Sequence, residues 1–297
     1  MNAMAVLNKN IECIYNKPAL LGESPLWDPE EQVLYWVDIE KPALHCFDPQ
    51  TKKHRVWSMP TEIGCIALRA AGGLVAAMRY GYANIALPSG EITMINTVLT
   101  DADGVMFNDG KCDRAGRFWA GTKDLSEQAD IGALYRLDAT GHSTEITKGY
   151  AVSNGFAWSP DNTIFYVCNS PARIIYQYDF DIGAGSLKNK RIFAKLPDES
   201  GYPDGVTVDS EGGVWNAHWD GWRLTRYLPN GKIDDVIKMP VRRPTSCCFG
   251  GTNLTTLYVT SASTRLSAEE LKQDPLAGCV FAVDVGIKGL LEPKFVG

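Results

Sequence analysis

The sequence lacks long apolar segments and the short motifs that identify common hydrolases and nucleotide-binding proteins. No run approaches the roughly 18 apolar residues of a membrane-spanning helix, so spanning helices are not expected. Residues 1–15 lack a basic stretch followed by an apolar one, so we expect no secretory signal. GxSxG, HExxH and P-loop motifs are absent, and residues 101–104 lack the remainder of an EF-hand loop. These absences argue against the protein classes that those motifs define.

Cysteine pairs and an excess of basic residues are missing as well. The eight cysteines form no CxxC pair and no zinc-ligand spacing, and most lie in apolar runs such as residues 63–66. We therefore expect them to be reduced and buried in a cytoplasmic protein. The formal net charge is −6, which argues against nucleic acid or an anionic membrane as the main partner.

Long helical periodicity is also lacking. Instead, Val, Ile, Tyr, Phe and Trp come in short bursts between turns rich in Asp, Asn, Gly and Pro, which is typical of β-strands. Of the 297 residues, 45% are hydrophobic, enough for a sizeable core. We predict a short helix only for residues 267–273.

The strand-like bursts recur as a repeating unit. The six units start 40 to 50 residues apart, at Glu23, Ile63, Asn108, Asn154, Asp204 and Thr245. Four strands per unit and six units predict an all-β fold, a six-bladed β-propeller with four-stranded blades around a central channel. We expect a single domain over residues 1–297, with an N-terminal strand at about 11–16 completing the last blade beside residues 279–283. An array of β-sandwiches is the alternative.

Propeller topology predicts where the polar side chains meet. The first strand of each blade lines the channel, and the loop after the second strand returns to the same mouth. We therefore expect Glu23, Asn108, Asn154, Asp204 and Thr245 to form a ring at this mouth, which is the default place for a site. The surrounding loops carry polar and aromatic residues that include Arg79, Tyr80, Lys123 and His218. For His218, a packing role is the alternative.

Within this ring, Glu23, Asn154 and Asp204 form a candidate metal site. Two carboxylates and an amide oxygen are hard ligands that suit Ca²⁺, Mg²⁺ or Mn²⁺ and hold Zn²⁺ or Fe²⁺ less selectively. Two carboxylates in a channel mouth repel each other unless a cation lies between them. The alternative is that the Asn-Gly and Asp-Gly dipeptides are ordinary turns.

Five motifs carry a family resemblance: GESPLW at 22–27, FNDGK at 107–111, SNG at 153–155, PDG at 203–205 and TSCCFGG at 245–251. In this order and spacing they resemble the senescence-marker-protein (regucalcin)/gluconolactonase family, from about residue 12 to the C-terminus. The resemblance implies a six-bladed propeller that binds one divalent metal and hydrolyses sugar lactones. It also implies that Glu23, Asn154 and Asp204 are the metal ligands and that Asn108 contacts the substrate.

The chain departs from the vertebrate members of this family at two places. Met106 stands where they carry an arginine, so one sugar contact is expected to be lost, and residues 123–126 differ from their lid segment. Residues 217–222 look closer to bacterial sugar-lactone lactonases. The reaction class therefore transfers better than the particular sugar.

The resemblance leads to a mechanistic hypothesis. We expect the metal, with calcium as the first choice, to polarise the lactone carbonyl, and Asp204 to act as general base toward the attacking water. Residues expected to hold the sugar hydroxyls are Asn108, Arg79, Tyr80, Lys123 and His218. Two alternatives are a calcium-binding regulatory protein and an organophosphate hydrolase on the same metal site. The expected partner is a small sugar lactone, and the expected state is a monomer or weak homo-oligomer.

Overall fold

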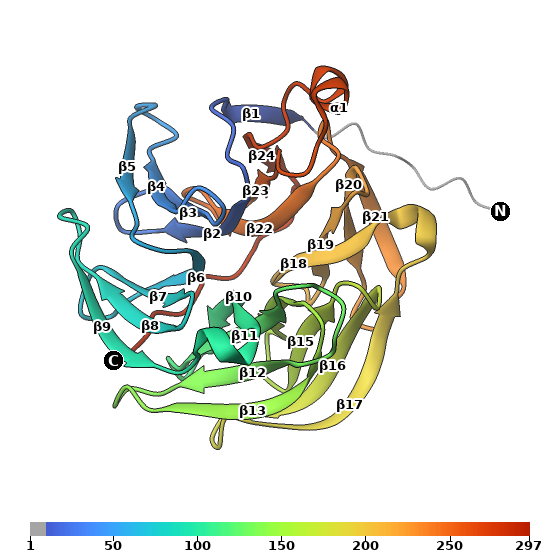
Figure 1. The fold of residues 1–297 in the computed structure, drawn as a ribbon. Helices are drawn as coiled ribbons and strands as arrows, with labels where there is room; N and C mark the ends of the chain where they lie inside the picture. Colours follow the sequence, from blue (N-terminus) through green and yellow to red (C-terminus); the bar gives the residue numbers. More distant parts are fainter. Residues whose placement is uncertain (1–9) are drawn as a thin grey trace.

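The computed structural model describes residues 10–297, and the strands in this range form six four-stranded antiparallel sheets around a central channel (Figure 1). This confirms the predicted six-bladed propeller and excludes an array of sandwiches. In every blade the first strand in the chain is innermost, except that the last blade takes its outermost strand from the N-terminus.

The strands follow the predicted repeat. Blade 1 contains β2 (Gly22–Asp28), β3 (Val33–Asp38), β4 (Ala43–Phe47) and β5 (His54–Ser58). Blade 2 contains β6 (Ile63–Leu68), β7 (Leu74–Met78), β8 (Gly81–Ile85) and β9 (Ile92–Thr97). Blade 3 contains β10 (Val105–Cys112), β11 (Phe118–Asp124), β12 (Gly132–Leu137) and β13 (Ser143–Tyr150). Blade 4 contains β14 (Ser153–Trp158), β15 (Ile164–Asn169), β16 (Ile174–Asp181) and β17 (Ser186–Lys195).

The remaining blades close the ring. Blade 5 contains β18 (Tyr202–Val208), β19 (Val214–Trp219), β20 (Arg223–Tyr227) and β21 (Ile233–Lys238). Blade 6 contains β22 (Pro244–Gly250), β23 (Thr256–Ser261), β24 (Val280–Asp284) and β1 (Ile11–Tyr15). β1 pairs antiparallel with β24, with Ile11 opposite Val283, so the N-terminal strand and the last strand of the chain complete one blade. A short helix α1 (Ala268–Gln273), capped by Ser267, lies between β23 and β24, where a helix was predicted.

The first strand of every blade contains an irregularity near the same mouth of the channel. In β2 the pairing register shifts between Glu23 and Leu26, and equivalent shifts occur in β6, β10, β14, β18 and β22. A bulge of this kind bends the strand and redirects side chains that simple alternation would place elsewhere. The predicted ring residues therefore lie at or beside bulges.

The Asn-Gly and Asp-Gly dipeptides lie inside strands β14 and β18, so their interpretation as turns is wrong. Gly155 shows why glycine is needed in such a bulge. Its φ is +64°, and an added Cβ would lie 2.8 Å from the Asp204 carbonyl oxygen and 2.6 Å from Val206 Cγ2. A larger residue would push the neighbouring blade away from Asn154.

Buried tryptophans tie the second strands to the turns that precede them. Trp119 in β11 and Trp215 in β19 are fully buried, and each Nε1 donates a 2.8 Å hydrogen bond to an aspartate, Asp113 and Asp209 respectively. Each aspartate also accepts a bond from an arginine Nε. These contacts fix the turns at the face of the ring opposite the predicted site.

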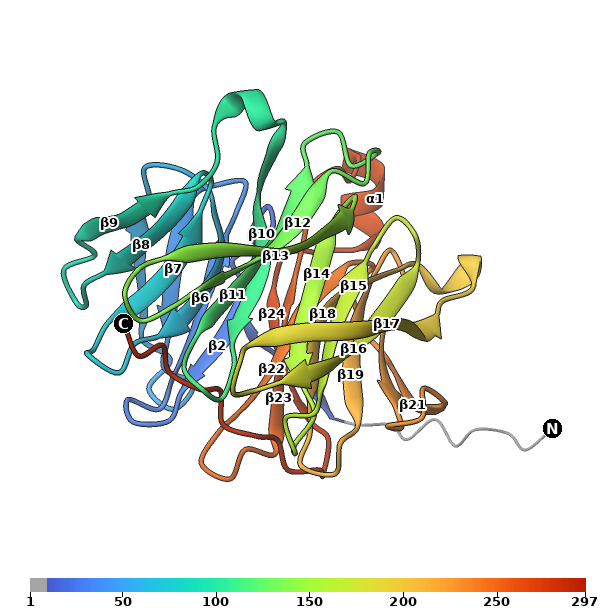
Figure 2. The same ribbon diagram turned by 90° about the horizontal axis from the view of Figure 1, so that it is seen from below.

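The C-terminal segment crosses that opposite face beneath the inner strands (Figure 2). The Phe295 amide donates to the Leu68 carbonyl at 2.8 Å, and Phe295 itself is buried. Glu292 forms a 2.9 Å ion pair with Lys111, which lies near the end of inner strand β10. The tail thereby covers the channel on this side.

The remaining expectations concern cysteines and membrane segments. All eight cysteines are free, and seven are buried while Cys13 is half-buried, as predicted for most of them. Among residues 10–297, no helix has the length and apolar character needed to cross a membrane.

Candidate functional site

A cavity of about 310 Å³ opens at the mouth where the inner strands begin, a size typical of small-molecule sites. Its walls come from blades 1, 3, 4, 5 and 6. Of the residues predicted from the sequence, the lining includes Glu23, Asn108, Lys123, Asn154 and Asp204. Residues that are 131 and 50 positions apart in the chain thus share one cavity.

Glu23, Asn154 and Asp204 lie at the buried end of this cavity, with 7%, 6% and 5% of their surfaces exposed. Burial raises the pKa of Glu23 well above its usual range, and the charges of Asp204 and Asp109 raise it further. Burial likewise raises the pKa of Asp204, and Asp109 again adds to the effect. Two carboxylates in this setting are costly to keep ionised without a nearby positive charge.

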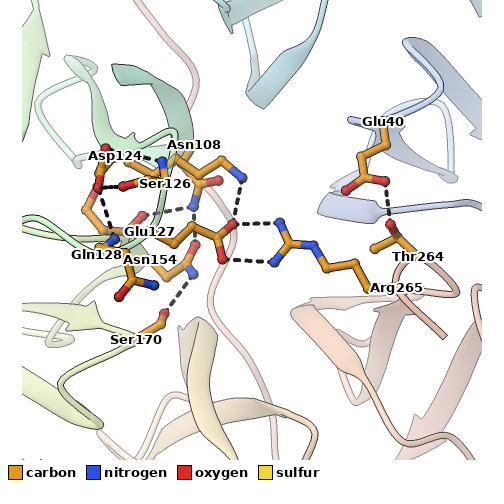
Figure 3. Close-up of polar contacts among 12 residues, drawn as sticks. Glu40, Asn108, Asp124, Ser126, Glu127, Gln128, Asn154, Ser170, Thr264 and Arg265 are labelled. Carbon is orange, nitrogen blue, oxygen red and sulfur yellow. Dashed lines mark hydrogen bonds and ion pairs between the residues drawn. The ribbon is translucent and has the colours of Figure 1, made fainter. Parts of the chain in front are cut away.

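Hydrogen bonds orient the amide of Asn154 (Figure 3). Ser170 Oγ donates to the Pro203 carbonyl at 2.6 Å, so it accepts from Asn154 Nδ2 at 2.9 Å. Asn154 therefore turns its Oδ1 the other way, where it accepts from Asn108 Nδ2 at 2.6 Å. Asn108 Nδ2 also donates to the Ser153 carbonyl at 3.1 Å. The network presents an amide oxygen to the cavity.

This donor set fits a hard divalent cation. Within residues 10–297, no cluster of three or more His, Cys, Asp or Glu side chains is arranged as a metal site, and the present set contains two carboxylates and one amide. Oxygen ligands from carboxylates and amides are those that Ca²⁺ and Mg²⁺ prefer. A divalent ion would also remove the repulsion that raises the pKa of Glu23.

Asp109 is a buried member of the site that the sequence analysis missed. Its Oδ2 accepts from the Gly155 amide and its Oδ1 from the Gly110 amide, both at 2.7 Å. It therefore ties the bulge of β10 to the bulge that holds Asn154 in the next blade. The FNDGK motif contains Asp109, but nothing in its spacing indicates contact with blade 4.

A second polar cluster crosses the outer part of the cavity (Figure 3). Glu127, from the loop after β11, and Arg265, from the loop after β23, point toward one another and form a double ion pair with distances of 2.8 and 2.9 Å. Lys123 Nζ lies 3.4 Å from Glu127 Oε1. Glu127 and Arg265 both line the cavity. They are 138 residues apart in the sequence, and their spacing gave no indication that they form an ion pair.

Asp124 organises the loop that carries Glu127. Its Oδ2 accepts from the amides of Gln128 and Ala129 at 2.9 and 2.8 Å, and Ser126 Oγ donates to it at 2.5 Å. These bonds, led by that of Ala129, lower the pKa of Asp124, so the carboxylate is charged. The loop is therefore folded back over the mouth.

Three predicted substrate contacts lie outside the cavity lining. Arg79 forms a 2.6 Å ion pair with Glu62 and donates to the Tyr80 hydroxyl at 2.7 Å, while Tyr80 bonds to Asp101. The physical reason is that β7 and β8 are joined by these two residues alone, so this hairpin turn does not extend over the mouth.

His218 is buried within β19, and its neighbour Trp219 lines the cavity instead. Because a carbonyl only accepts, His218 Nδ1 carries the proton in its 2.8 Å bond to the Ser200 carbonyl. Burial lowers the pKa of His218 to about 4. The arrangement matches the packing alternative for this residue.

Arg243 joins the loops of blades 5 and 6 at the cavity wall. Its guanidinium lies 4.7 Å from the centre of the Trp219 ring, and its Nε donates to Asp220 at 2.7 Å. Nη1 donates to the carbonyl of Thr264, the residue before Arg265. This buried arginine thus supports two lining residues and was not apparent from the sequence.

Comparisons with known proteins all find similarity to gluconolactonases and regucalcins. Residues 21–263 match the family described as "SMP-30/Gluconolactonase/LRE-like region". The chain is 40% identical to 6-deoxy-6-sulfogluconolactonase of Pseudomonas putida over 98% of its length and 100% of that protein. It is 37% identical to regucalcin of Danio rerio, covering 97% and 98%. The crystal structure of a calcium-binding protein, regucalcin, from Agrobacterium tumefaciens superimposes with a TM-score of 0.93 at 25% identity, covering 97% of both chains.

Proposed function

Because the chain belongs to the SMP-30/gluconolactonase/LRE-like family, we propose that it hydrolyses a sugar lactone to the sugar acid in this cavity. The observation that carries the proposal is the meeting of Glu23, Asn154 and Asp204, from three blades, at the buried end of a cavity lined by polar groups. The lactonase from P. putida, similar over its whole length, supports an aldonolactone as substrate.

We infer that Glu23, Asn154 and Asp204 hold one divalent cation, with calcium as the expected ion. The calcium-binding relative from A. tumefaciens and the hard donor set support this choice. When bound, such an ion would polarise the lactone carbonyl and stabilise the charge that develops on its oxygen. Asn108 supports the site by holding the Asn154 amide in the orientation that presents oxygen.

Asp204 is the proposed general base. Its carboxylate takes a proton from water while the water oxygen forms a bond to the carbonyl carbon. The bond between the carbonyl carbon and the ring oxygen then breaks, and the ring oxygen receives the proton. Burial raises the pKa of Asp204 in the metal-free protein, whereas a bound cation would lower it and would also acidify the attacking water, so that a weaker base suffices.

The lactone is held by groups of the lining. Lys123 offers N–H donors to sugar hydroxyls, and the Trp219 ring forms part of the wall. Asn108 offers its Oδ1 as an acceptor, because both hydrogens of its Nδ2 are donated to Ser153 and Asn154. Contacts of Arg79, Tyr80 and His218 with the substrate stay predictions from the sequence, and their hydrogen bonds elsewhere do not support them.

The test is hydrolysis of a panel of aldonolactones by the purified protein, with and without chelator. We expect turnover that chelator abolishes and that added calcium or another divalent ion restores. The similarity to regucalcin makes a calcium-binding regulatory protein the second candidate, which predicts tight calcium binding without turnover. Organophosphate esters in the same panel examine the remaining alternative. Full activity in the presence of chelator would refute the metal-dependent mechanism.

A further inference from the structure

The two ends of the cavity differ in charge. The buried end holds the carboxylates of Glu23 and Asp204, and the exposed Arg265 lies in the outer part. Lys123 lies between them, because its charge acts on both buried carboxylates and its Nζ also approaches Glu127. Arg265 has 55% of its side-chain surface exposed and Lys123 has 14%, so the two cations lie at different depths of the mouth. A lactone whose carbonyl lies at the buried end would direct its far end toward these cations.

Lys123 and Arg265 both approach one carboxylate, that of Glu127. Arg265 binds it through two nearly parallel bonds of 2.8 and 2.9 Å, the fork geometry with which arginine recognises carboxylate and phosphate groups. Lys123 approaches the same carboxylate at 3.4 Å, which is long for a charged hydrogen bond. Its ammonium has three donors, so it retains capacity for a further acceptor.

The Glu127 carboxylate can be replaced at low cost. The Arg265–Glu127 pair is partly exposed, with 55% and 29% of the side-chain surfaces accessible, and ion pairs at the surface contribute only about 0.2 to 1 kcal/mol. Glu127 and Arg265 both have left-handed backbone conformations, with φ angles of 59° and 58° respectively. Glu40 of blade 1, the other carboxylate of the lining besides Glu23, Asp204 and Glu127, accepts a hydrogen bond from Thr264 of blade 6 (Figure 3).

From this arrangement we propose that Lys123 and Arg265 form a subsite for an anionic substituent at the end of the lactone remote from its carbonyl. In the free protein the Glu127 carboxylate occupies this subsite. A carboxylate, sulfonate or phosphate on the substrate displaces it and receives the Arg265 fork and the Lys123 ammonium. The inference rests on the proposed lactone hydrolysis and adds the substrate class, a lactone that bears a negative charge.

The experiment compares D-glucono-1,5-lactone with its 6-phosphate, which adds an anion at the far end. The measured quantity is the ratio of kcat/KM for the phosphorylated lactone to that for the neutral lactone. Arg265→Gln should lower this ratio by about tenfold or more, because the fork is lost. Glu127→Gln should raise it, because the internal competitor loses its charge. Arg242→Gln, which removes a partly exposed arginine paired with Asp220 and Glu270 outside the lining, is the matched control and should leave the ratio unchanged.

The two variants are expected to change the kcat/KM ratio in opposite directions. This distinguishes an anion subsite from an ion pair that merely links the two loops across the mouth. If both variants shift the ratio in the same direction, or neither shifts it, the anion subsite is refuted. Calorimetric binding of 6-phosphogluconate and gluconate to each variant provides a readout that needs no turnover. If the wild-type protein hydrolyses no lactone, the proposed function is refuted. The subsite is then still tested by calorimetry, in which Arg265→Gln should lose the tighter binding of 6-phosphogluconate relative to gluconate. Circular dichroism and melting temperature establish that each variant is folded.

Discussion

At the scale of single residues, Asp204 has two proposed tasks, as cation ligand and as base. Glu23 has the first task alone, although both carboxylates are buried to a similar degree. An amide of the same shape retains one oxygen ligand but accepts no proton at neutral pH. Replacing each carboxylate by its amide therefore separates the two tasks.

We expect Asp204→Asn to lower kcat by about 10² to 10⁴-fold at saturating calcium, the usual contribution of a general base. Glu23→Gln removes the same unit of charge and should weaken calcium binding while retaining more of kcat at saturation. Steady-state kinetics with D-glucono-1,5-lactone and calcium titration by calorimetry measure both effects. Equal kcat losses in the two variants at saturation would contradict the base role.

At the scale of the element, the bulged inner strand positions the site. The bulge of β14 brings Asn154 to the cavity, and its Gly155 amide is held by Asp109 from the neighbouring blade at 2.7 Å. The same glycine contacts β18 so closely that a Cβ would meet Val206, the Asp204 carbonyl and Cys168 Sγ within 3 Å. The bulge therefore sets the separation of blades 4 and 5 beside two proposed ligands.

Gly155→Ala is expected to destabilise the protein by about 2 to 4 kcal/mol, through left-handed backbone and overpacking together, and to weaken calcium binding. Gly286→Ala is the matched control, because Gly286 has a similar φ of 68° but nothing within 4 Å of an added Cβ. It should cost only the backbone term of about 1 to 2 kcal/mol and leave calcium affinity unchanged. Urea unfolding and calorimetry measure the two quantities, and identical behaviour of both variants would argue against a positioning role for the bulge.

At the scale of the whole molecule, the ring is closed by β1 and one face is covered by the C-terminal segment. The tail reaches the interior through Glu292, whose 2.9 Å ion pair with Lys111 has only 13% and 19% of the side-chain surfaces exposed. A second pair in the same tail, Lys294 with Glu30, is far more exposed at 33% and 74%. The first contact is therefore expected to be important for stability and the second is not.

Glu292→Gln should lower the free energy of unfolding by about 3 kcal/mol, because it leaves the Lys111 ammonium buried without its anionic partner. Lys294→Ala should change it by less than about 1 kcal/mol. Urea denaturation of both variants measures the difference. Similar small losses would show that the buried pair does not hold the tail.

The whole molecule should also lose stability in mild acid. Burial lowers the pKa of His45 and of His218 to about 4, below the ordinary value of 6.5, so both are neutral in the folded protein. The unfolded chain binds protons first, and the stability that each neutral histidine contributes above pH 6.5 is lost as pH falls toward 4. His218→Gln, which keeps a donor for the Ser200 carbonyl, should reduce the decline in unfolding free energy between pH 7 and 4.5 by up to about 3 kcal/mol. An unchanged decline would contradict neutral burial of His218.

The repeat and its motifs were sufficient to predict the ring of blades. Alternating strand and turn composition is local information, and the spacing of Glu23, Asn154 and Asp204 within equal units implies equal places in the ring. The short helix predicted for residues 267–273 is also present, at 268–273. The ligand role of the three residues stays a prediction.

Contacts between distant loops could not be predicted from the sequence repeat. Whether a rim residue faces the cavity depends on loop length and on bulges, which is why Trp219 lines the wall while Arg79 and Tyr80 bond to their own blade. The pairing of Glu127 with Arg265, the support from Arg243 and the link from Asp109 to Gly155 each join parts of the chain that no repeat relates. Local spacing thus predicts the ring and its polar centre, whereas the charges at the mouth follow from three-dimensional packing, because ion pairs and buried hydrogen bonds depend on distances in space.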